Sequence, residues 1–321
     1  MRGGAQLGAR TARAAGWTLG ARLAARLFDI AVILVLARVL GPEEFGLVAL
    51  AVGVVQLSEA ILEMPVAALI ARERSVSRRL LDTCFTLGLL RGLLLAGALA
   101  AAAFPLATFY SMPEVGPLIM AIALAPIFRG ILNPRLVLLA RRLDYRLEVS
   151  IEVGSKAVAS IAALVLGLAT GSYWALALAT ILAPVLGAIL SYIALPYRPR
   201  LRLSHWRRLR HAVGWNVARQ VAAAFNWQIG RLMAGRLVPA GALGHFSMAD
   251  QIATLPRQVL VFPLLKPLVA GLAAARDGTQ ETALALGACR AVFALAGPVL
   301  VAAAVLAPEI VPMLLGAGWG P

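Results

Sequence analysis

Arginine and lysine side chains interrupt several long apolar runs of this sequence, and their type suits them to binding chemistry. A charge inside hydrocarbon is costly, so such side chains face protein or a water-filled cavity rather than lipid. Guanidinium groups bind phosphate oxygens in a bidentate manner, so arginines in one cavity predict a site for a pyrophosphate or a similar anion. The candidate binding residues are Arg22, Arg26, Arg91, Arg219, Arg257 and Lys266.

Acidic side chains in the same runs have two interpretations. They can neutralise the buried cations as internal ion pairs, or they can bind H⁺ or Na⁺ as coupling groups. Arg22, Arg26 and Asp29 follow an i, i+4, i+7 spacing, which predicts one charged stripe on a helix, and Glu59 and Glu63 are also one turn apart. The acidic candidates are Asp29, Glu59, Glu63, Glu152 and Asp250.

No arrangement typical of an enzyme is found in the sequence. The histidines His205, His211 and His245 are scattered, and no metal-ligand spacing, nucleophile elbow or glycine-rich phosphate loop is present. Cys84 and Cys289 lie in apolar runs without a cysteine or histidine at ligand spacing, which favours a role as small core residues. We therefore expect a protein that is not an enzyme and has no cofactor beyond a coupling ion.

The composition determines which elements position these residues. Hydrophobic residues make up 61% of the chain and charged residues 14%, against about 25% charged residues in soluble domains. Apolar runs of about 20 residues, the length that crosses a bilayer, recur along the chain. The runs are continuous rather than alternating, which predicts an all-α, polytopic transmembrane helical bundle. The expected helices cover residues 15–40, 44–71, 81–108, 116–140, 149–169, 173–195, 212–237, 241–273 and 283–307.

The net charge of +15 comes from basic residues that are concentrated in every second polar segment between the apolar runs. Seventeen arginines lie in or beside five polar segments, whereas the other breaks contain neither Lys nor Arg. This is the distribution of the positive-inside rule, and it predicts a cytoplasmic N-terminus in a bacterial inner membrane. The basic loops then meet anionic membrane lipids, and nucleic acid is not expected as a partner. The breaks without basic residues are 41–44, 109–116, 170–173, 238–242 and 316–321.

An internal repeat relates residues 16–65 to residues 214–263. Eleven of the fifty aligned positions are identical, and they include Arg38 with Arg236 and Pro65 with Pro263. This pattern indicates an ancient duplication in which two helical lobes build one site between them. Glu59 aligns with Arg257, which suggests an ion pair between the lobes that forms in one access state.

The repeat predicts a domain organisation of two lobes. Residues 1–196 form a six-helix lobe, residues 197–211 a basic cytoplasmic linker, and residues 212–321 the start of a second lobe. Trp206 and Leu209 in the linker are consistent with a short helix in the headgroup layer or with a solvated basic loop. A second lobe with three helices is incomplete, so we expect about nine helices of a total of twelve or more.

Two segments resemble a known family. LARVLGPEEFGLVALA at 36–51 and APEIVPMLLGAGW at 307–319 are similar to segments of the polysaccharide flippases, the Wzx-like branch of an exporter superfamily that also holds the multidrug and toxic-compound extruders. The resemblance implies a two-lobed fold with a V-shaped cavity. It also implies transfer of an undecaprenyl-pyrophosphate-linked oligosaccharide from the cytoplasmic to the periplasmic leaflet, for the synthesis of exopolysaccharide, capsule or O-antigen.

Two alternatives remain open at this point. A multidrug or cation antiporter of the same fold would have a cavity dominated by acidic residues, whereas basic residues dominate here. A membrane scaffold would organise polysaccharide assembly without moving a substrate. Polysaccharide polymerases and glycosyltransferases are the protein partners that the resemblance implies.

Overall fold

The computed structural model describes residues 20–21, 24–63, 70, 76–141, 144–204, 220–223, 230, 232–256 and 278–319. The chain divides into two compact units, Met1–Leu243 and Gly244–Pro321, each of which is described by itself. The predicted boundaries at 196 and 211 stay a prediction.

The described residues are mainly helical and contain no β-strand, which confirms the predicted all-α fold. Five helical segments are long and apolar enough to cross a membrane. They are α2 (Pro42–Ile61), α4 (Arg78–Tyr110), α8 (Arg146–Thr170), α9 (Trp174–Ala194) and Leu284–Glu309 within α13 (Gly278–Leu315). The protein is therefore a polytopic helical membrane protein.

The break at Gly41–Pro42 begins α2 as the sequence predicts. The Gly41 amide donates to Glu44 Oε2 at 2.8 Å, and Pro42 occupies the first turn, where its missing N–H costs nothing.

The C-terminal end of α2 differs from the prediction. α2 ends at Ile61, and Leu62 forms a turn, whereas the sequence pattern predicts a helix to residue 71. Pro65 explains the early end, because proline disfavours helical geometry in the residue before it and donates no hydrogen bond.

The predicted fourth helix is divided into α5 (Val115–Ile122), α6 (Ala125–Gly130) and α7 (Leu136–Arg141). Pro126 lies in the first turn of α6 and Pro134 lies in the second break, where a residue without an N–H group interrupts the helix. The second break, at 131–135, meets the end of α9. Asn133 Nδ2 donates to the Ser191 and Leu195 carbonyl oxygens at 3.1 and 2.6 Å. The Asn133 side chain thus supplies donors at the C-terminal end of α9, where a helix no longer has amides of its own for every carbonyl.

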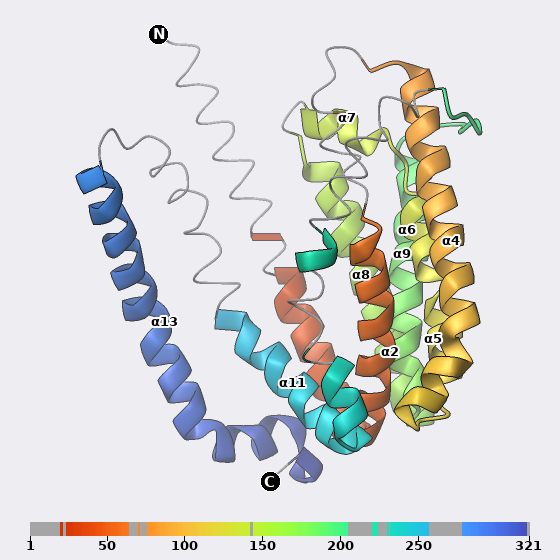
Figure 1. Ribbon diagram of the computed structural model, residues 1–321. Coiled ribbons are helices and arrows are strands. Elements are labelled where there is room, and N and C mark those ends of the chain that lie inside the picture. The colour runs from red at the N-terminus through yellow and green to blue at the C-terminus, as the bar shows by residue number, and fades with distance from the viewer. Residues whose placement is uncertain are drawn as a thin grey trace. The chain divides into compact units, whose positions relative to one another are not determined.

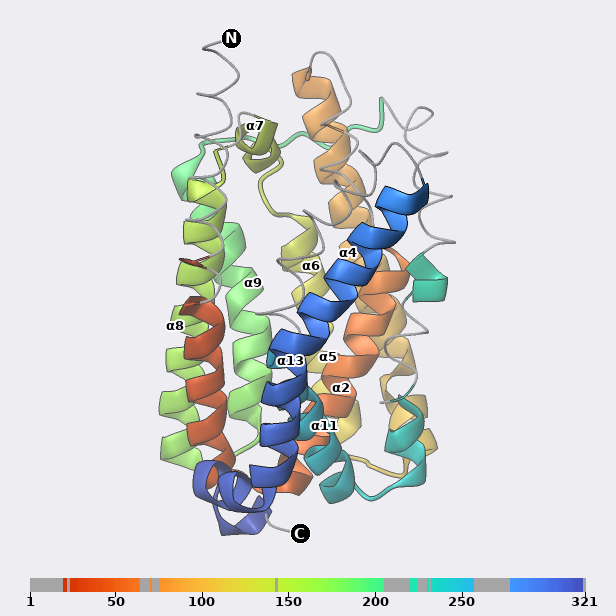
Figure 2. The ribbon, with the colours of Figure 1, turned by 90° about the vertical axis from the view of Figure 1, so that its left-hand side faces the viewer.

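Within unit 1, α4 lies beside α5 and α6, α6 packs on α9, and α9 packs along α8 (Figures 1 and 2). Glycines allow the closest of these contacts. A Cβ on Gly88 of α4 would lie 2.2 Å from the carbonyl oxygen of Gly130 in α6, and a Cβ on Gly92 would lie 2.8 Å from Ile127 Cα. The two backbones therefore touch, as small residues permit in membrane helices.

Exposed apolar side chains mark the membrane-spanning part of unit 1. On α4 they extend from Leu90 to Phe109, and on α9 from Trp174 to Ile193. Each band is about 28 Å long at 1.5 Å per residue, close to the roughly 30 Å hydrocarbon core of a bilayer. The first turns of α4 extend beyond this band at the end of unit 1 that also holds α7 and the end of α9 (Figure 1).

In unit 2, α11 (Ala240–Pro256) continues from unit 1, and α13 runs to Leu315. The sequence predicts an end near residue 307, but the helix continues through Pro308 and Pro312. Trp319, in the turn after α13, is buried and packs edge-on against His245 with ring centroids 5.5 Å apart. The remainder of the predicted helix 241–273 lies outside the described residues.

Candidate functional site

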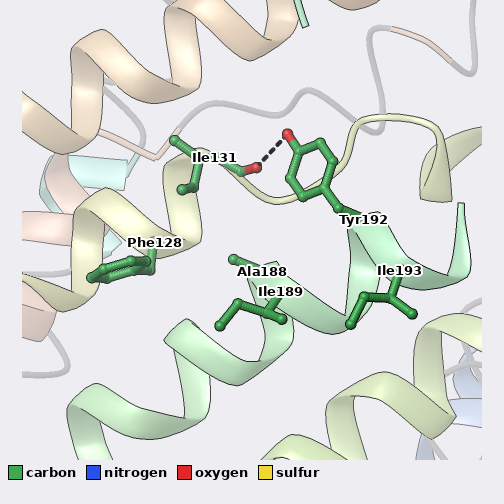
Figure 3. A pocket seen from close by; sticks show the side chains of 6 residues that line it. All are labelled: Phe128, Ile131, Ala188, Ile189, Tyr192 and Ile193. Atoms are coloured by element: carbon green, nitrogen blue, oxygen red, sulfur yellow. Dashed lines mark hydrogen bonds between the residues drawn. The ribbon is translucent and has the colours of Figure 1, made fainter. Parts of the chain in front are cut away.

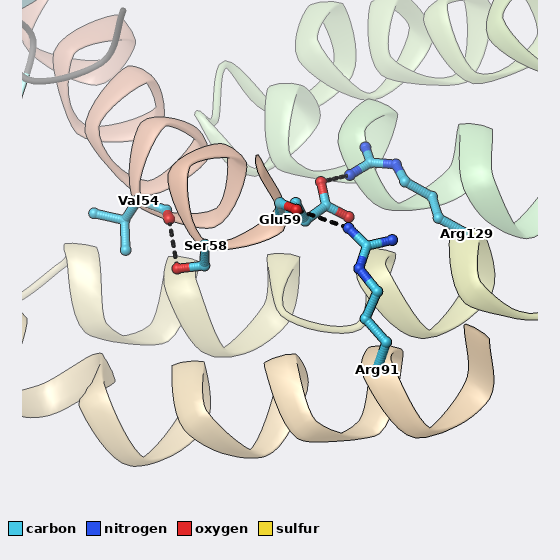
Figure 4. Close-up of polar contacts among 5 residues, drawn as sticks. All are labelled: Val54, Ser58, Glu59, Arg91 and Arg129. Atoms are coloured by element: carbon cyan, nitrogen blue, oxygen red, sulfur yellow. Dashed lines mark hydrogen bonds and ion pairs between the residues drawn. The ribbon is translucent and has the colours of Figure 1, made fainter. Parts of the chain in front are cut away.

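A cluster of charged side chains surrounds the end of α2 (Figure 4). The Glu59 carboxylate pairs with the Arg129 guanidinium of α6, and Arg91 of α4 donates to the Glu59 carbonyl oxygen at 2.8 Å. The Glu59 side chain is 14% exposed, whereas Arg129 is 41% exposed. Three helices thus bring one carboxylate and two guanidinium groups together.

The geometry of the helix end explains why Arg91 binds the backbone. The last carbonyls of a helix have no intrahelical donor. The Leu62 amide donates to Ser58 and the Glu63 amide to Ala60, at 3.4 and 3.3 Å, so the Glu59 carbonyl is left for Arg91. A cation here is also favourable because the C-terminal end of a helix carries partial negative charge. The early end of α2 therefore creates the acceptor.

The glycine contact between α4 and α6 determines where the two arginines lie. Arg91 lies between Gly88 and Gly92 in sequence, and Arg129 precedes Gly130. Because the two backbones touch at these glycines, both guanidinium groups reach the end of α2. Arg129 was not among the candidate residues, although it lies in an apolar run. Only its contact with Glu59 distinguishes it from the other arginines of such runs.

Glu63 lies beyond the end of α2 rather than on its face, so it does not share a helical stripe with Glu59. Gln220 Nε2 donates to the Glu63 carboxylate. Gln220 belongs to the predicted seventh helix and was also missed as a site residue. A neutral amide in a membrane run gives little signal, since it is equally suited to helix packing.

Arg26 and Asp29 lie on the helix over residues 24–39, and both are half-buried. Asp29 accepts a hydrogen bond from Ser160 Oγ of α8 at 3.2 Å. Arg26 Nε is buried and has no hydrogen-bond partner among the described residues. The predicted stripe therefore contains an aspartate bound to α8 and an arginine whose Nε is available to a further acceptor.

The other acidic candidates have different surroundings. Glu152 pairs with Lys156 one turn later on α8 at 3.2 Å, and both side chains are exposed. Such a pair contributes only about 0.3–0.5 kcal/mol, so it is a local helix contact. Asp250 lies on α11. Arg22, Arg219, Arg257 and Lys266 lie outside the described residues, so the pairing of Glu59 with Arg257 stays a prediction.

An apolar cavity of about 440 Å³ lies between α6 and α9 (Figure 3). Its one polar side chain, Tyr192, donates to the Ile131 carbonyl oxygen at 2.9 Å, at the break after α6. The cavity therefore offers shape and hydrocarbon contact without a free polar group. Its lining residues are Phe128, Ile131, Ala188, Ile189, Tyr192 and Ile193.

Neither cysteine lies in a reactive arrangement. Cys84 is buried in a core cluster with Leu80 and Leu87, whereas Cys289 is exposed on α13, so the predicted core position is wrong for Cys289. Within the ranges that the structure describes, no three His, Cys, Asp or Glu side chains come together as a metal site.

Comparison with known proteins gives matches over most of the chain. Residues 35–321 match a family described as polysaccharide biosynthesis protein. The succinoglycan biosynthesis transport protein ExoT of Rhizobium meliloti (strain 1021) is 24% identical over 253 residues, which are 78% of this chain and 51% of that protein. The lipopolysaccharide biosynthesis protein WzxC of Escherichia coli (strain K12) is 21% identical over 295 residues, 89% of this chain and 59% of that protein. The chain thus spans somewhat more than half the length of these relatives. No solved structure matches it significantly.

Proposed function

The chain belongs to the polysaccharide biosynthesis protein family, and we propose that it acts as a membrane flippase for a polyprenyl-pyrophosphate-linked oligosaccharide. The direction that we propose is from the cytoplasmic to the periplasmic leaflet of a bacterial inner membrane. The two relatives are named for succinoglycan transport and for lipopolysaccharide biosynthesis, which supports a cargo of this class.

One observation supports an anionic cargo above the others. In the part of the chain that the structure describes, Arg26 Nε is buried without a hydrogen-bond partner, as is Arg91 Nε, while Asp29 is engaged by Ser160. A buried donor without an acceptor costs about 1–3 kcal/mol or more for a charged group, so a ligand that supplies an acceptor gains that free energy. A pyrophosphate presents several charged oxygens that a guanidinium binds in a bidentate manner.

In the proposed mechanism, Arg26 and the neighbouring Arg22 bind the pyrophosphate within a cavity shared by two lobes, while the polyprenyl chain stays in lipid. Arg219, Arg257 and Lys266 are the proposed contributors of the second lobe. The lobes would open alternately to each side of the membrane, as in transporters built from repeats. A two-lobed architecture of the multidrug-extruder type is part of this proposal.

The α2 end cluster supports the choice of cargo in a second way. A cation antiporter needs an acidic group that is free to bind its substrate, yet Glu59 is paired with Arg129 and Glu63 accepts from Gln220. Coupling to H⁺ or Na⁺ stays part of the proposal, with Glu59, Glu63 and Asp29 as the candidate groups, and Glu59 and Glu63 would have to leave Arg129 and Gln220 to bind the ion. Polysaccharide polymerases and glycosyltransferases are the proposed protein partners.

The test is complementation of a flippase-deficient strain with the full-length gene and its Arg26→Gln variant. We expect export of the lipid-linked oligosaccharide to fall at least tenfold, because a charge-assisted hydrogen bond contributes about 1.5–3 kcal/mol. Arg26→Lys should restore part of the export, since it keeps the charge without the bidentate geometry. Outer-leaflet oligosaccharide and the amount of protein in the membrane are measured together.

Arg38→Gln is the matched control, because Arg38 lies on the same helix and is exposed. It should leave export within about twofold of the wild type, as surface substitutions usually have small effects. Normal export by the Arg26→Gln and Arg22→Gln variants would remove these residues from the site. Failure of the wild-type gene to restore export would favour a scaffold without transport.

A further inference from the structure

The 196–204 segment, which follows α9, is extended and lies along the first turns of α4. Asp82 is the main contact, and it is only 2% exposed. Its carboxylate accepts a short hydrogen bond from the Tyr197 hydroxyl and a longer one, 3.4 Å, from the Arg200 amide. The guanidinium of Arg135 lies 5.7 Å from the centre of the Tyr197 ring, which is itself buried.

Further hydrogen bonds continue this contact along α4. Thr86 Oγ1 accepts from the Arg202 amide at 2.9 Å, and Arg78 donates to the Arg198 carbonyl oxygen at 3.3 Å. The partners on α4 thus include residues 78, 82 and 86, which are one turn apart on the same face, and Thr83, whose hydroxyl lies 3.4 Å from Ser204 Oγ. Hydrogen bonds therefore fix the backbone of the 196–204 segment at alternate residues. The positions of the Cα atoms that carry its side chains are fixed as a result.

These contacts use the backbone of Arg198, Arg200 and Arg202, and they leave the guanidinium groups of these three arginines unused. Arg198, Arg200 and Arg202 are exposed, and no hydrogen bond or ion pair joins their side chains to another residue that the structure describes. Arg78 and Arg79 are exposed nearby at the start of α4. The segment therefore presents several cations whose side chains form no ion pair with a described residue; Asp82, the carboxylate beside them, is bound by the Tyr197 hydroxyl and the Arg200 amide.

The residues between the arginines are apolar and also exposed. Leu201 is 71% exposed and Leu203 is 49% exposed. Because alternate side chains of an extended chain point in opposite directions, the segment has a cationic edge and an apolar edge. It begins three residues after Ile193, the last large exposed apolar residue of α9, so it lies at the boundary of the membrane-spanning band. A cationic edge and an apolar edge together match the headgroup and acyl regions of a lipid leaflet.

We infer that the 196–204 segment is a binding surface for anionic phospholipid headgroups, with Arg198, Arg200 and Arg202 as the phosphate ligands. Asp82 and Tyr197 are positioning residues, because they hold the backbone that carries these arginines. A soluble phosphate compound would leave Leu201 and Leu203 in water, whereas a leaflet covers them. The inference depends on the membrane location alone and is independent of the transported cargo.

The experiment measures binding of phosphatidylglycerol to the purified full-length protein in detergent by native mass spectrometry, with phosphatidylcholine as the neutral comparison. The Arg198→Gln/Arg200→Gln/Arg202→Gln variant should bind phosphatidylglycerol roughly 100-fold more weakly, at about fivefold per arginine. Its binding of phosphatidylcholine should not change. Arg38→Gln/Arg236→Gln is the control, because it removes exposed arginines near the opposite end of the spanning band.

Tyr197→Phe tests the positioning role, since it removes one hydroxyl and no charge. We expect a twofold to fivefold weaker affinity for phosphatidylglycerol with an unchanged dependence on salt, whereas the triple variant should lose most of that dependence. Equal binding of both lipids, or full affinity in the triple variant, overturns the inference. Displacement of phosphatidylglycerol by millimolar-scale inorganic pyrophosphate at low salt, without any preference between lipids, would instead indicate a soluble phosphate ligand.

Discussion

Glu59 and Asp82 are two poorly exposed carboxylates of unit 1 that are stabilised in opposite ways. Glu59 is near the C-terminal end of α2 and has two arginines around it. Asp82 is one turn inside the N-terminal end of α4, and its partners are a phenol and a backbone amide. The helix dipole accounts for the difference, because a negative charge is unfavourable near a C-terminus and favourable near an N-terminus.

The comparison shows that nearby arginines do not by themselves identify a ligand site. At the end of α2 the guanidinium groups are engaged by the protein, so they serve the structure of unit 1. Beside Asp82 the arginines of the 196–204 segment contact the other described residues through their backbone only, and their charges are not engaged there. Arg26 Nε has no partner among the described residues, and neither has Arg91 Nε, but Arg91 also donates to the Glu59 carbonyl oxygen, whereas no acceptor for Arg26 is found in the described ranges.

The largest effect should come from closing the glycine contact that assembles the α2 end cluster. In Gly88→Ala the new Cβ would meet the Gly130 carbonyl oxygen at 2.2 Å, so α4 and α6 must separate and both arginines must leave Glu59. We expect a loss of about 1–3 kcal/mol, the usual cost of overpacking, as a lower melting temperature in detergent. Gly97→Ala is the control on the same helix, since no atom lies within 4 Å of its Cβ. Equal melting temperatures for the two variants would contradict the backbone contact.

An intermediate effect is expected when the charge at Glu59 is removed. Glu59→Gln leaves Arg91 and Arg129 without a carboxylate, and the loss should be about 1–2 kcal/mol, because Arg129 is 41% exposed and water screens it. The double variant Glu59→Gln/Arg129→Gln should recover part of that loss, measured as the coupling energy of a double-mutant cycle in thermal unfolding.

Asp82→Asn should lower the free energy of unfolding by less than Glu59→Gln does, since no cation is left unpaired. The reverse order would show that Asp82 also depends on a nearby cation.

The smallest effect concerns pH at the Asp82 contact. Burial and the hydrogen bond to Asp82 raise the pKa of Tyr197, because both disfavour the phenolate. The protonated phenol is thus favoured in the folded state. Its contribution to stability is complete below the ordinary tyrosine pKa of about 10 and is lost as the pH rises through the higher folded pKa. The ultraviolet difference titration between wild type and Tyr197→Phe measures this residue alone. A transition at or below pH of about 10 would contradict the buried contact with Asp82.

The sequence predicted local features well where the cause was local. The break at Gly41–Pro42 and the division of the fourth helix at Pro126 and Pro134 follow from backbone chemistry within a few residues. The end of α2 at Ile61 could also have been found, because Pro65 restricts the residue before it. The hydrophobic pattern continues across Pro65, and the helix predicted from that pattern was therefore too long.

The site was predictable only as a set of residue types. The sequence indicated charged residues in apolar runs, but it did not indicate that Glu59 would pair with Arg129 or that Gln220 would bind Glu63. Asp82 was not predicted as a site residue. Its position shortly after Arg78 and Arg79, near the start of a predicted helix, was a signal that it takes part in polar contacts. Many pairings satisfy the same rule of opposite charge, so sequence distance and charge do not select among them.

The sequence by itself determined the membrane class, the sorting of basic residues between alternate breaks, and the family, because hydropathy and charge act residue by residue. The tertiary structure decided which charges are engaged and which are free. That outcome depends on the backbone contact at Gly88 and Gly130 and on the path of the 196–204 segment along α4. Both arise from packing between segments far apart in the chain, where the distance between two groups, rather than their type, determines the free energy of their interaction.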